Sequence, residues 1–150
     1  MHQTEQVADG EERVRSSFAK QGLMATLGAT LEKVSPGGVE IALRPTPSIS
    51  QQHGFVHAGA VSAIADTAAG YAALTLMPAS AGVLTTEFKI NLIAPAKGDR
   101  IVAIGKVVKS GRTLTLAQTE VFAENDGQSK LIALLTATLM AVQGRDGVSD

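Results

Sequence analysis

The sequence lacks cysteine and tryptophan altogether, and aromatic residues make up only 3% of the chain. Without cysteine there is no disulfide, no thiolate zinc site and no cysteine nucleophile. A large excess of one charge is also missing: the formal net charge is −1, whereas general nucleic-acid binding needs a basic patch. The N-terminal segment is polar and acidic and does not have the basic and then apolar order of a secretory signal. We therefore expect a cytoplasmic protein that binds no nucleic acid.

The 150 residues are typical of one globular domain. A chain of this length buries roughly 68–70% of the surface that its unfolded form exposes, so it needs neither a metal nor a disulfide for stability. Its hydrophobic share of 45% and charged share of 18% are those of an ordinary soluble protein. We predict a single domain over residues 1–150, in which residues 1–22 form a loose N-terminal extension with a short helix over residues 11–20.

Charge is missing from one long stretch, because Asp66 is the only Asp, Glu, Lys or Arg between Arg44 and Glu87. Residues 55–77 within this stretch are long enough to span a bilayer. They are dominated by Ala, Gly, Ser and Thr, however, and a carboxylate near the centre of a membrane is costly. The pattern favours a buried helix in a protein that does not enter the membrane.

Most of the remaining chain has strand patterns. Residues 83–93 alternate between apolar and polar side chains, and the turns Ser110-Gly111 and Asn125-Asp126-Gly127 indicate hairpins of an antiparallel sheet. Residues 130–142 are apolar on both faces and fit a strand or a helix; their Thr content and the preceding hairpin favour a central strand. The predicted strands are residues 25–34, 39–44, 83–93, 99–109, 113–124 and 130–142, and the predicted long helix covers residues 58–76.

The predicted long helix has two different sides at about 100° per residue. Its large apolar side chains should pack on the sheet, which gives an α+β fold: Val61, Ile64, Tyr71 and Leu74. Asp66 points the other way, among small residues that let a second subunit or a thin ligand approach: Gly59, Ser62, Ala63, Gly70 and Ala73. Asp66 is then either a solvated or backbone-bonded surface residue, or a general base whose pKa is raised by partial desolvation.

The residues His57-Ala58-Gly59 stand at the predicted start of this helix. The first backbone N–H groups of a helix have no intrahelical acceptor and lie at its positive end. Such groups can hold a developing oxyanion, and the same geometry suits a phosphate. The small side chains would leave room for a carbonyl group to approach.

Three segments resemble one known family. They are HGFVHAGAVSAIAD, with nine residues from His57 to Asp66, VLTTEFKINLIAPAKGD and VVKSGRTLTLAQTEV. Together they are similar to the HGG…D signature and the downstream strands of hotdog-fold acyl-CoA thioesterases, of the phenylacetate-degradation (PaaI) type. The resemblance covers residues 22–142 and implies a long helix wrapped by a mostly antiparallel sheet. It implies hydrolysis of an aromatic or short- to medium-chain acyl-CoA to the free acid and CoA, with no cofactor, since CoA enters as part of the substrate.

The resemblance also implies roles for single residues. Asp66 would act on water as a general base or attack the thioester directly, and the N–H of Ala58, together with that of Gly59, would form the oxyanion hole. Gln51 would orient the thioester or the water, and Thr85 would help to position water. The residues that would hold the CoA moiety are Lys109, Gly111, Arg112 and Thr113. The site would form in a homodimer or homotetramer, with Asp66 facing a loop of the partner.

The sequence departs from the family signature in two places: HAG replaces HGG, which adds a methyl group beside the oxyanion hole, and Gln51 replaces a shorter Asn. Two other functions fit the same fold, a non-catalytic acyl-CoA binding or sensor module and an enoyl-thioester dehydratase that uses His57 or His53. A metal site at His53 and His57 is disfavoured, because Gly54 and the predicted loop argue against a helix there. We expect His57 to fix the loop by hydrogen bonding.

Overall fold

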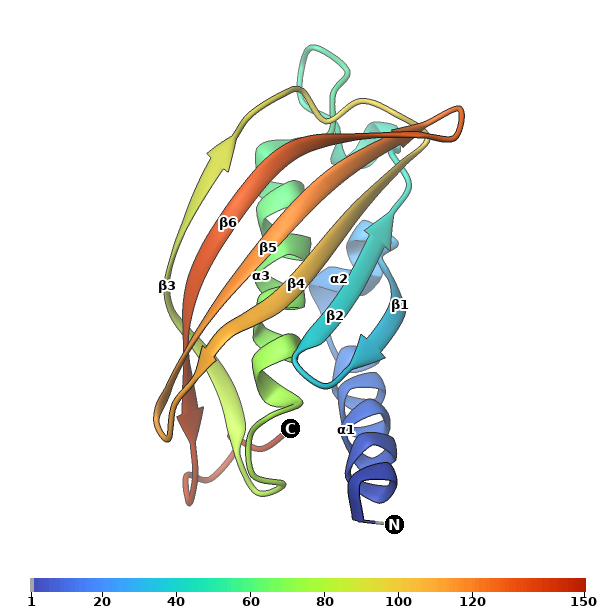
Figure 1. Ribbon diagram of the computed structural model, residues 1–150. Coiled ribbons are helices and arrows are strands. Elements are labelled where there is room, and N and C mark those ends of the chain that lie inside the picture. The colour runs from blue at the N-terminus through green and yellow to red at the C-terminus, as the bar shows by residue number, and fades with distance from the viewer. Residues whose placement is uncertain (1) are drawn as a thin grey trace.

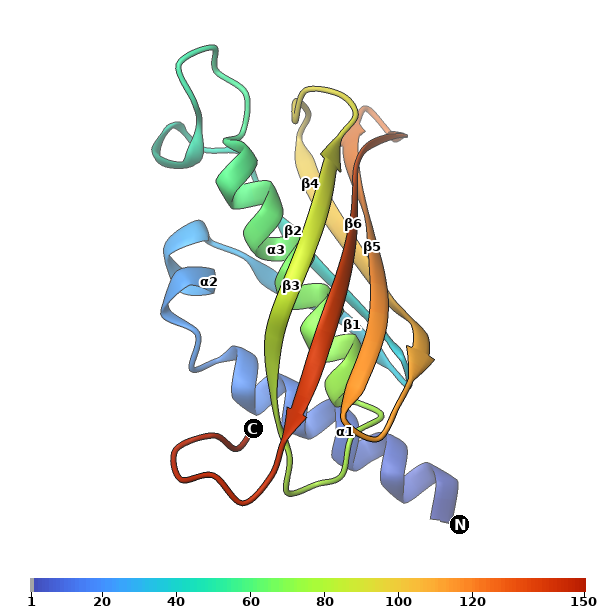
Figure 2. The ribbon, with the colours of Figure 1, turned by 90° about the vertical axis from the view of Figure 1, so that its left-hand side faces the viewer.

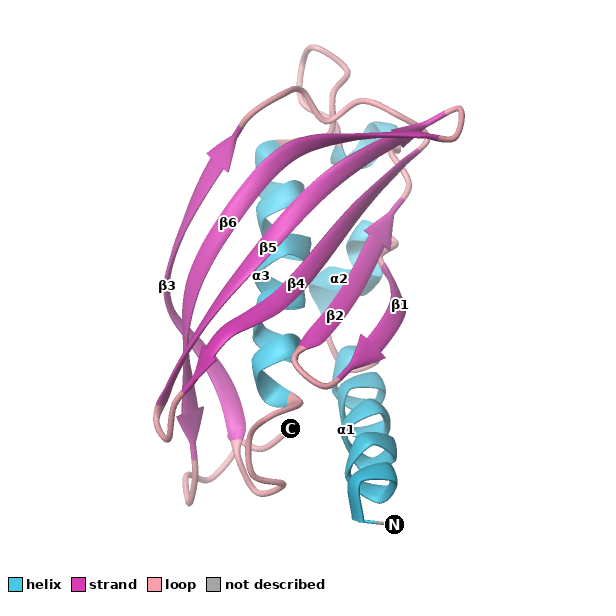
Figure 3. Cartoon of the chain, viewed as in Figure 1, coloured by secondary structure: helices cyan, strands magenta, loops and turns pink. Residues whose placement is uncertain are grey.

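The computed structural model describes the backbone of residues 2–150 and the side chains from residue 9 onward. One six-stranded antiparallel sheet, in the order β1-β2-β4-β5-β6-β3, curves around the long helix α3 (Figure 1). The strands form one layer and the helices lie on a single face of it (Figure 3). The helices are α1 (His2–Phe18), α2 (Gly22–Leu27) and α3 (Ala58–Leu74), and the strands are β1 (Thr30–Ser35), β2 (Gly38–Leu43), β3 (Gly82–Leu92), β4 (Arg100–Ser110), β5 (Leu114–Asn125) and β6 (Gln128–Val142). This arrangement confirms the expected α+β hotdog fold.

The N-terminal part of the prediction is only partly right. The predicted helix over residues 11–20 is the second half of α1, which begins at His2, so residues 2–10 are helical and not a loose end; Met1 lies outside the described residues. Residues 25–27 belong to helix α2 instead of a strand. Gly28, with φ of 64°, ends α2 in the left-handed conformation and donates its N–H to the Ala25 carbonyl, and β1 begins only at Thr30.

The C-terminal strands follow the prediction closely. Strands β4, β5 and β6 are joined by hairpins, and β3 returns to pair with β6. The ambiguous last run is strand β6, which lies between β5 and β3. Helix α3 ends at Leu74, with Thr75 as its C-cap, two residues before the predicted end. No helix within residues 2–150 is long and apolar enough to cross a membrane.

Sheet and helix touch most closely where β4 and β5 cross the middle of α3. A Cβ atom at Gly105 of β4 would lie 2.5 Å from the carbonyl carbon of Ala68, so only glycine fits there. Thr119, opposite Gly105 on β5, is fully buried and donates its hydroxyl to the Ala65 carbonyl at 2.8 Å. The sheet therefore holds the peptide that directly precedes Asp66, and the close approach of Gly105 is to the backbone of Ala68 and Ala69.

The expected division of α3 into two faces is only partly right. Val61, Ile64 and Leu74 are buried as predicted, but Gly70 and Ala73 of the supposed small face are buried too. Tyr71 packs against α1, with its ring 6.4 Å from that of Phe18 between centroids. The reason is that α1 and α2 cover the flank of α3 that the sheet leaves open (Figure 2).

Candidate functional site

Asp66 projects from the middle of α3 toward the start of β3. The hydroxyl of Thr85 donates a hydrogen bond of 2.7 Å to Oδ1 of Asp66. The carboxyl group is half-buried, and this desolvation raises its pKa, while the hydrogen bond from Thr85 acts in the opposite direction. No ion pair among the described side chains includes Asp66. The structure thus contains an isolated carboxylate that is partly removed from water and held by one neutral donor.

A cavity of about 250 Å³, the Asp66 pocket, opens beside this carboxylate. Besides Asp66 and Thr85, its walls consist of Gln21, Leu23, Ala63, Thr67, Gly70, Tyr71 and Val83. The Tyr71 hydroxyl accepts a 2.8 Å hydrogen bond from the Gln21 amide and lies 3.0 Å from the Ser17 hydroxyl. Gln21 was not predicted as a site residue, and Tyr71 was expected on the sheet, because nothing in the pattern of α3 indicates that α1 and α2 form a wall of this pocket.

The N-terminus of α3 is capped by a histidine. The Nδ1 atom of His57 accepts the Gly59 N–H at 2.8 Å, which is the capping bond of the helix. The Gly59 N–H, expected as a second oxyanion donor, is therefore already engaged within the chain. The Ala58 N–H occupies the first helical position, where no intrahelical acceptor exists, and no acceptor for it is recorded within residues 2–150.

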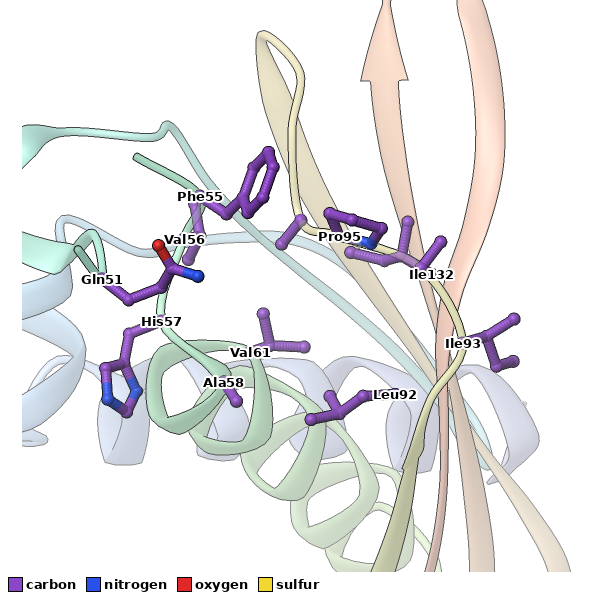
Figure 4. A pocket seen from close by; sticks show the side chains of 12 residues that line it. Gln51, Phe55, Val56, His57, Ala58, Val61, Leu92, Ile93, Pro95 and Ile132 are labelled. Atoms are coloured by element: carbon purple, nitrogen blue, oxygen red, sulfur yellow. The ribbon is translucent and has the colours of Figure 1, made fainter. Parts of the chain in front are cut away.

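Gln51 lies in the loop that leads into α3. Its Oε1 atom accepts the His53 N–H at 2.5 Å, and its own backbone N–H donates to the Phe55 carbonyl at 2.8 Å. The first of these bonds fixes the orientation of the side-chain amide, because only the oxygen can accept, and it leaves Nε2 available as a donor. Gln51 and His57 lie side by side at one end of a second cavity (Figure 4).

This second cavity, the Ala58 pocket, has a volume of about 430 Å³. It lies between the N-terminus of α3 and the segment that follows β3. Its polar side chains are Gln51 and His57, and the remaining lining is apolar: Phe55, Val56, Ala58, Val61, Leu92, Ile93, Ala94, Pro95, Ala96 and Ile132. The free Ala58 N–H is thus placed in an apolar surrounding, where a hydrogen bond to a developing negative charge is strong.

The two pockets of one chain are separate. They share no lining residue, and the eight residues from Ala58 to Asp66 correspond to about 12 Å along the helix. A carbonyl group bound to the Ala58 N–H therefore lies beyond hydrogen-bond reach of Asp66 in the same chain. The structure brings Asp66 and Thr85 together, and separately Gln51, His57 and Ala58, but it does not unite these two groups within one chain.

The residues expected to hold CoA lie on the exposed hairpin between β4 and β5: Lys109, Gly111, Arg112 and Thr113. In Figure 1 this hairpin is at the opposite end of the sheet from the loop after β3 that lines the Ala58 pocket. A Cβ atom at Gly111 would collide with the Leu114 carbonyl oxygen, so the turn itself requires glycine there. Among the described residues, no group of three or more His, Asp or Glu side chains is arranged to hold a metal ion.

Comparisons with known proteins identify the family to which this fold belongs. The sequence model of the thioesterase superfamily matches residues 53–130, which include both Ala58 and Asp66. The crystal structure of a thioesterase family protein from Silicibacter pomeroyi is 50% identical, with a TM-score of 0.88 over 90% of this chain and 99% of that one.

Two more distant structures share the fold. The E. coli PaaI protein from the phenylacetic acid degradation operon is 18% identical, with a TM-score of 0.83 over 95% of this chain and 97% of that one. A thioesterase from Haemophilus influenzae is also 18% identical, with a TM-score of 0.79 over 87% and 90% of the two chains. The chain therefore belongs to the thioesterase superfamily and is a thioester hydrolase of the hotdog fold.

Proposed function

We propose that the protein hydrolyses acyl-CoA thioesters at a site that two copies of the chain build together. Asp66 of one copy acts on water as a general base or attacks the thioester carbon directly, and the Ala58 N–H of the other copy binds the carbonyl oxygen. The observation that carries the proposal is the half-buried Asp66 carboxylate, which is hydrogen-bonded to Thr85, faces a cavity and lies about 12 Å along α3 from the free Ala58 amide.

The edge of the sheet supplies a reason for two copies to meet. Strand β3 is an edge strand of 11 residues that is exposed over most of its length. Large apolar side chains on it or directly after it are exposed: Leu84, Phe88, Leu92 and Ile93. A long, exposed, apolar edge is a template for pairing with a second strand. The opposite edge, β1, has only six residues and is contacted by α1.

Two-fold symmetry then completes the site. When two copies of β3 pair antiparallel about a two-fold axis, the start of one strand lies beside the end of the other. Thr85 stands near the start of β3 and holds Asp66, whereas Leu92 and Ile93 stand at its end and line the Ala58 pocket. The same symmetry carries the partner's hairpin with Lys109 and Arg112 toward this pocket, where these cations would contact the CoA phosphates. The proposed assembly is a homodimer or a homotetramer of two such dimers. A measurement of its mass in solution distinguishes these two states.

The chemistry follows from these placements. In the general-base route, Asp66 removes a proton from water, the resulting hydroxide attacks the thioester carbon, and the Ala58 N–H stabilises the oxyanion. The carbon–sulfur bond then breaks, and the CoA thiolate receives the proton, which leaves the free acid and CoA. In the nucleophilic route, Asp66 attacks the carbon, the carbon–sulfur bond breaks and CoA leaves as the thiolate, which takes up a proton; water then hydrolyses the resulting anhydride to the free acid and restores the Asp66 carboxylate. Transfer of labelled oxygen from the solvent into Asp66 during a single turnover distinguishes the second route from the first.

The shared site is tested by mixing two inactive chains. Asp66→Asn and Ala58→Pro chains with different affinity tags are coexpressed, and the mixed assemblies are purified by both tags in sequence. A mixed dimer contains one site with neither substitution, so we expect about half of the wild-type activity per dimer. The reason is that one chain still supplies Asp66 and the other still supplies the Ala58 N–H.

Each variant chain purified alone is the control and should remain inactive. If mixed dimers are as inactive as the two parents, both groups act within one chain and the shared site is wrong. If wild-type protein binds acyl-CoA tightly but does not hydrolyse it, the chain is a non-catalytic acyl-CoA binding module and the proposed activity is wrong.

Thr85 should set the pH dependence of the reaction. Its hydroxyl donates to the Asp66 carboxylate and favours the ionised form, so Thr85→Val is expected to raise the pKa of Asp66 further. Because both routes need the carboxylate, the acid limb of the profile of kcat/KM against pH should move to higher pH in this variant. Thr85→Ser keeps the donor and should keep the wild-type limb; a limb that stays in place in Thr85→Val would contradict the assignment.

A further inference from the structure

We infer that the Ala58 pocket receives the acyl group and selects an apolar acyl group that has no polar substituent and no branch at the carbon next to the carbonyl. This inference rests on the proposed function, since it concerns the substrate of that same site. It is carried by three features of the pocket: its apolar lining, the engagement of its few polar groups, and the methyl group of Ala58.

The pocket offers almost nothing to a polar acyl substituent. Its polar side chains, Gln51 and His57, stand together at one end. Oε1 of Gln51 accepts the His53 N–H and Nδ1 of His57 accepts the Gly59 N–H, so the Nε2 atoms of these two side chains are the remaining side-chain donors, and both lie at that one end. The rest of the lining carries aliphatic or aromatic carbon. A hydroxyl or carboxylate on the far part of the acyl chain would lose its water without gaining a hydrogen bond, which lowers affinity strongly.

The same lining decides which half of the substrate enters. A thioester carbonyl at the Ala58 N–H carries the acyl group on one side and the pantetheine arm of CoA on the other. The pantetheine arm contains amide and hydroxyl groups, which need partners, and it must lead out to the phosphates. The acyl group needs only removal from water, which this pocket provides. The volume of about 430 Å³ lies within the range of cavities that bind small organic ligands, so it accepts a chain of several carbons.

Ala58 restricts the part of the acyl group nearest the carbonyl. The N–H and the Cβ of a residue in the first turn of a helix both point toward the helix N-terminus. In the Ala58 pocket the methyl group therefore lies beside the amide, with Phe55 and Pro95 across the cavity (Figure 4). An unbranched methylene next to the bound carbonyl fits beside this methyl group, whereas a branch at that carbon would clash with it. Linear chains are favoured over their branched isomers for this reason.

The first test is a substrate series with wild-type protein. Between acetyl-CoA and hexanoyl-CoA, kcat/KM should rise about fourfold for each added methylene until the pocket is full. 6-Hydroxyhexanoyl-CoA should react at least about tenfold more slowly than hexanoyl-CoA, because its hydroxyl lies among apolar side chains, away from Gln51 and His57. 2-Methylbutanoyl-CoA should react more slowly than its linear isomer pentanoyl-CoA. Equal rates along the series, or a hydroxylated substrate that reacts as fast as its parent, would overturn the inference.

The second test changes the pocket itself. Ala94 lies just after β3, is half-buried and lines the cavity, so Ala94→Leu places an isobutyl group inside it. The ratio of kcat/KM for hexanoyl-CoA to that for acetyl-CoA should fall by at least about tenfold. Ala79→Leu is the matched control, because Ala79 is exposed and lies outside the pocket, and it should retain the wild-type ratio. An unchanged ratio in Ala94→Leu would place the acyl group elsewhere.

Binding measurements separate this inference from the proposed hydrolysis. Dissociation constants of acetyl-CoA and hexanoyl-CoA are measured by calorimetry on Asp66→Asn, with and without Ala94→Leu. If the wild type hydrolyses no acyl-CoA while Asp66→Asn still binds the hexanoyl thioester more tightly through this pocket, the pocket assignment stands and the catalytic proposal fails. If hydrolysis proceeds but neither rate nor binding depends on chain length, the catalytic proposal stands and the pocket assignment is wrong.

Discussion

Asp66→Asn should lower kcat/KM for acyl-CoA hydrolysis by about 10²–10⁴-fold, the range over which general acid–base groups contribute. The amide has nearly the shape of the carboxylate and can still accept the hydrogen bond from Thr85, which is 2.7 Å long in the native protein. It can neither take a proton from water nor attack the thioester carbon. Steady-state rates on a panel of acyl-CoA thioesters measure this loss. A loss of less than about tenfold, or roughly 1.4 kcal/mol of barrier, is too small for an essential base or nucleophile.

The stability of the same variant provides an internal control. Burial raises the pKa of Asp66, so the folded protein binds this proton more tightly than the unfolded chain does. Above the folded pKa the ionised carboxylate therefore costs folding free energy, and the cost disappears as the pH falls below the unfolded pKa. Asp66→Asn should raise Tm at neutral pH, and the difference from wild type should vanish in acid. An inactive variant with this stability profile has lost chemistry and not structure.

Ala58→Pro should lower kcat by about 10²–10³-fold, the cost of removing one oxyanion donor. Proline has no N–H, and its ring is compatible with the first helical position, where the N–H is not part of the helix. The preceding residue, His57, already has the extended conformation that a residue before proline prefers, with φ of −60° and ψ of 139°. The substitution therefore deletes the proposed donor and leaves the helix in place, which circular dichroism and thermal unfolding can verify.

Ala58→Val is the matched control for this variant. Valine has the same number of side-chain carbons as proline and therefore fills the Ala58 pocket to a similar extent, but it retains the N–H. We expect Ala58→Val to be at least about tenfold more active than Ala58→Pro. If both variants lose the same activity, the effect comes from filling the pocket, and the oxyanion role of the Ala58 amide has to be abandoned.

The parts of the fold that depend on local pattern could be predicted from the sequence. Alternation located β3, turn residues marked the hairpins that join β4, β5 and β6, and the alanine-rich segment located α3, because the side-chain alternation of a half-buried strand, turn chemistry and helix propensity are all local properties. The bounds of the two helices before β1, α1 and α2, could not be predicted from local pattern. The apolar residues Leu23-Met24-Ala25 fit a strand or a helix. The feature that ends α2, the left-handed conformation of Gly28, is visible only in the folded chain.

The candidate site divides along the same line. The isolation of Asp66 and its separation from Ala58 along the chain are visible in the sequence, and the roles proposed for these two residues come from the family resemblance. That Gln21 and Tyr71 border the Asp66 pocket depends on how α1 and α2 pack against α3, which no local pattern shows. The hydrogen bond from the Gly59 N–H to Nδ1 of His57 depends on the rotamer of His57, which the sequence does not reveal either. Tertiary contacts thus determine which of several plausible donors is free.

The crossing of the sheet over α3 has a consequence for how such enzymes diversify. Gly105 and Thr119 hold the helix backbone next to Asp66, whereas Ala94 lies on a segment far from that contact. With the acyl group in the Ala58 pocket as inferred, substitutions at Ala94 alter which substrates are accepted without displacing the carboxylate. Leu92 and Ile93 also belong to the proposed contact between two copies, so directed evolution of substrate preference should begin at Ala94.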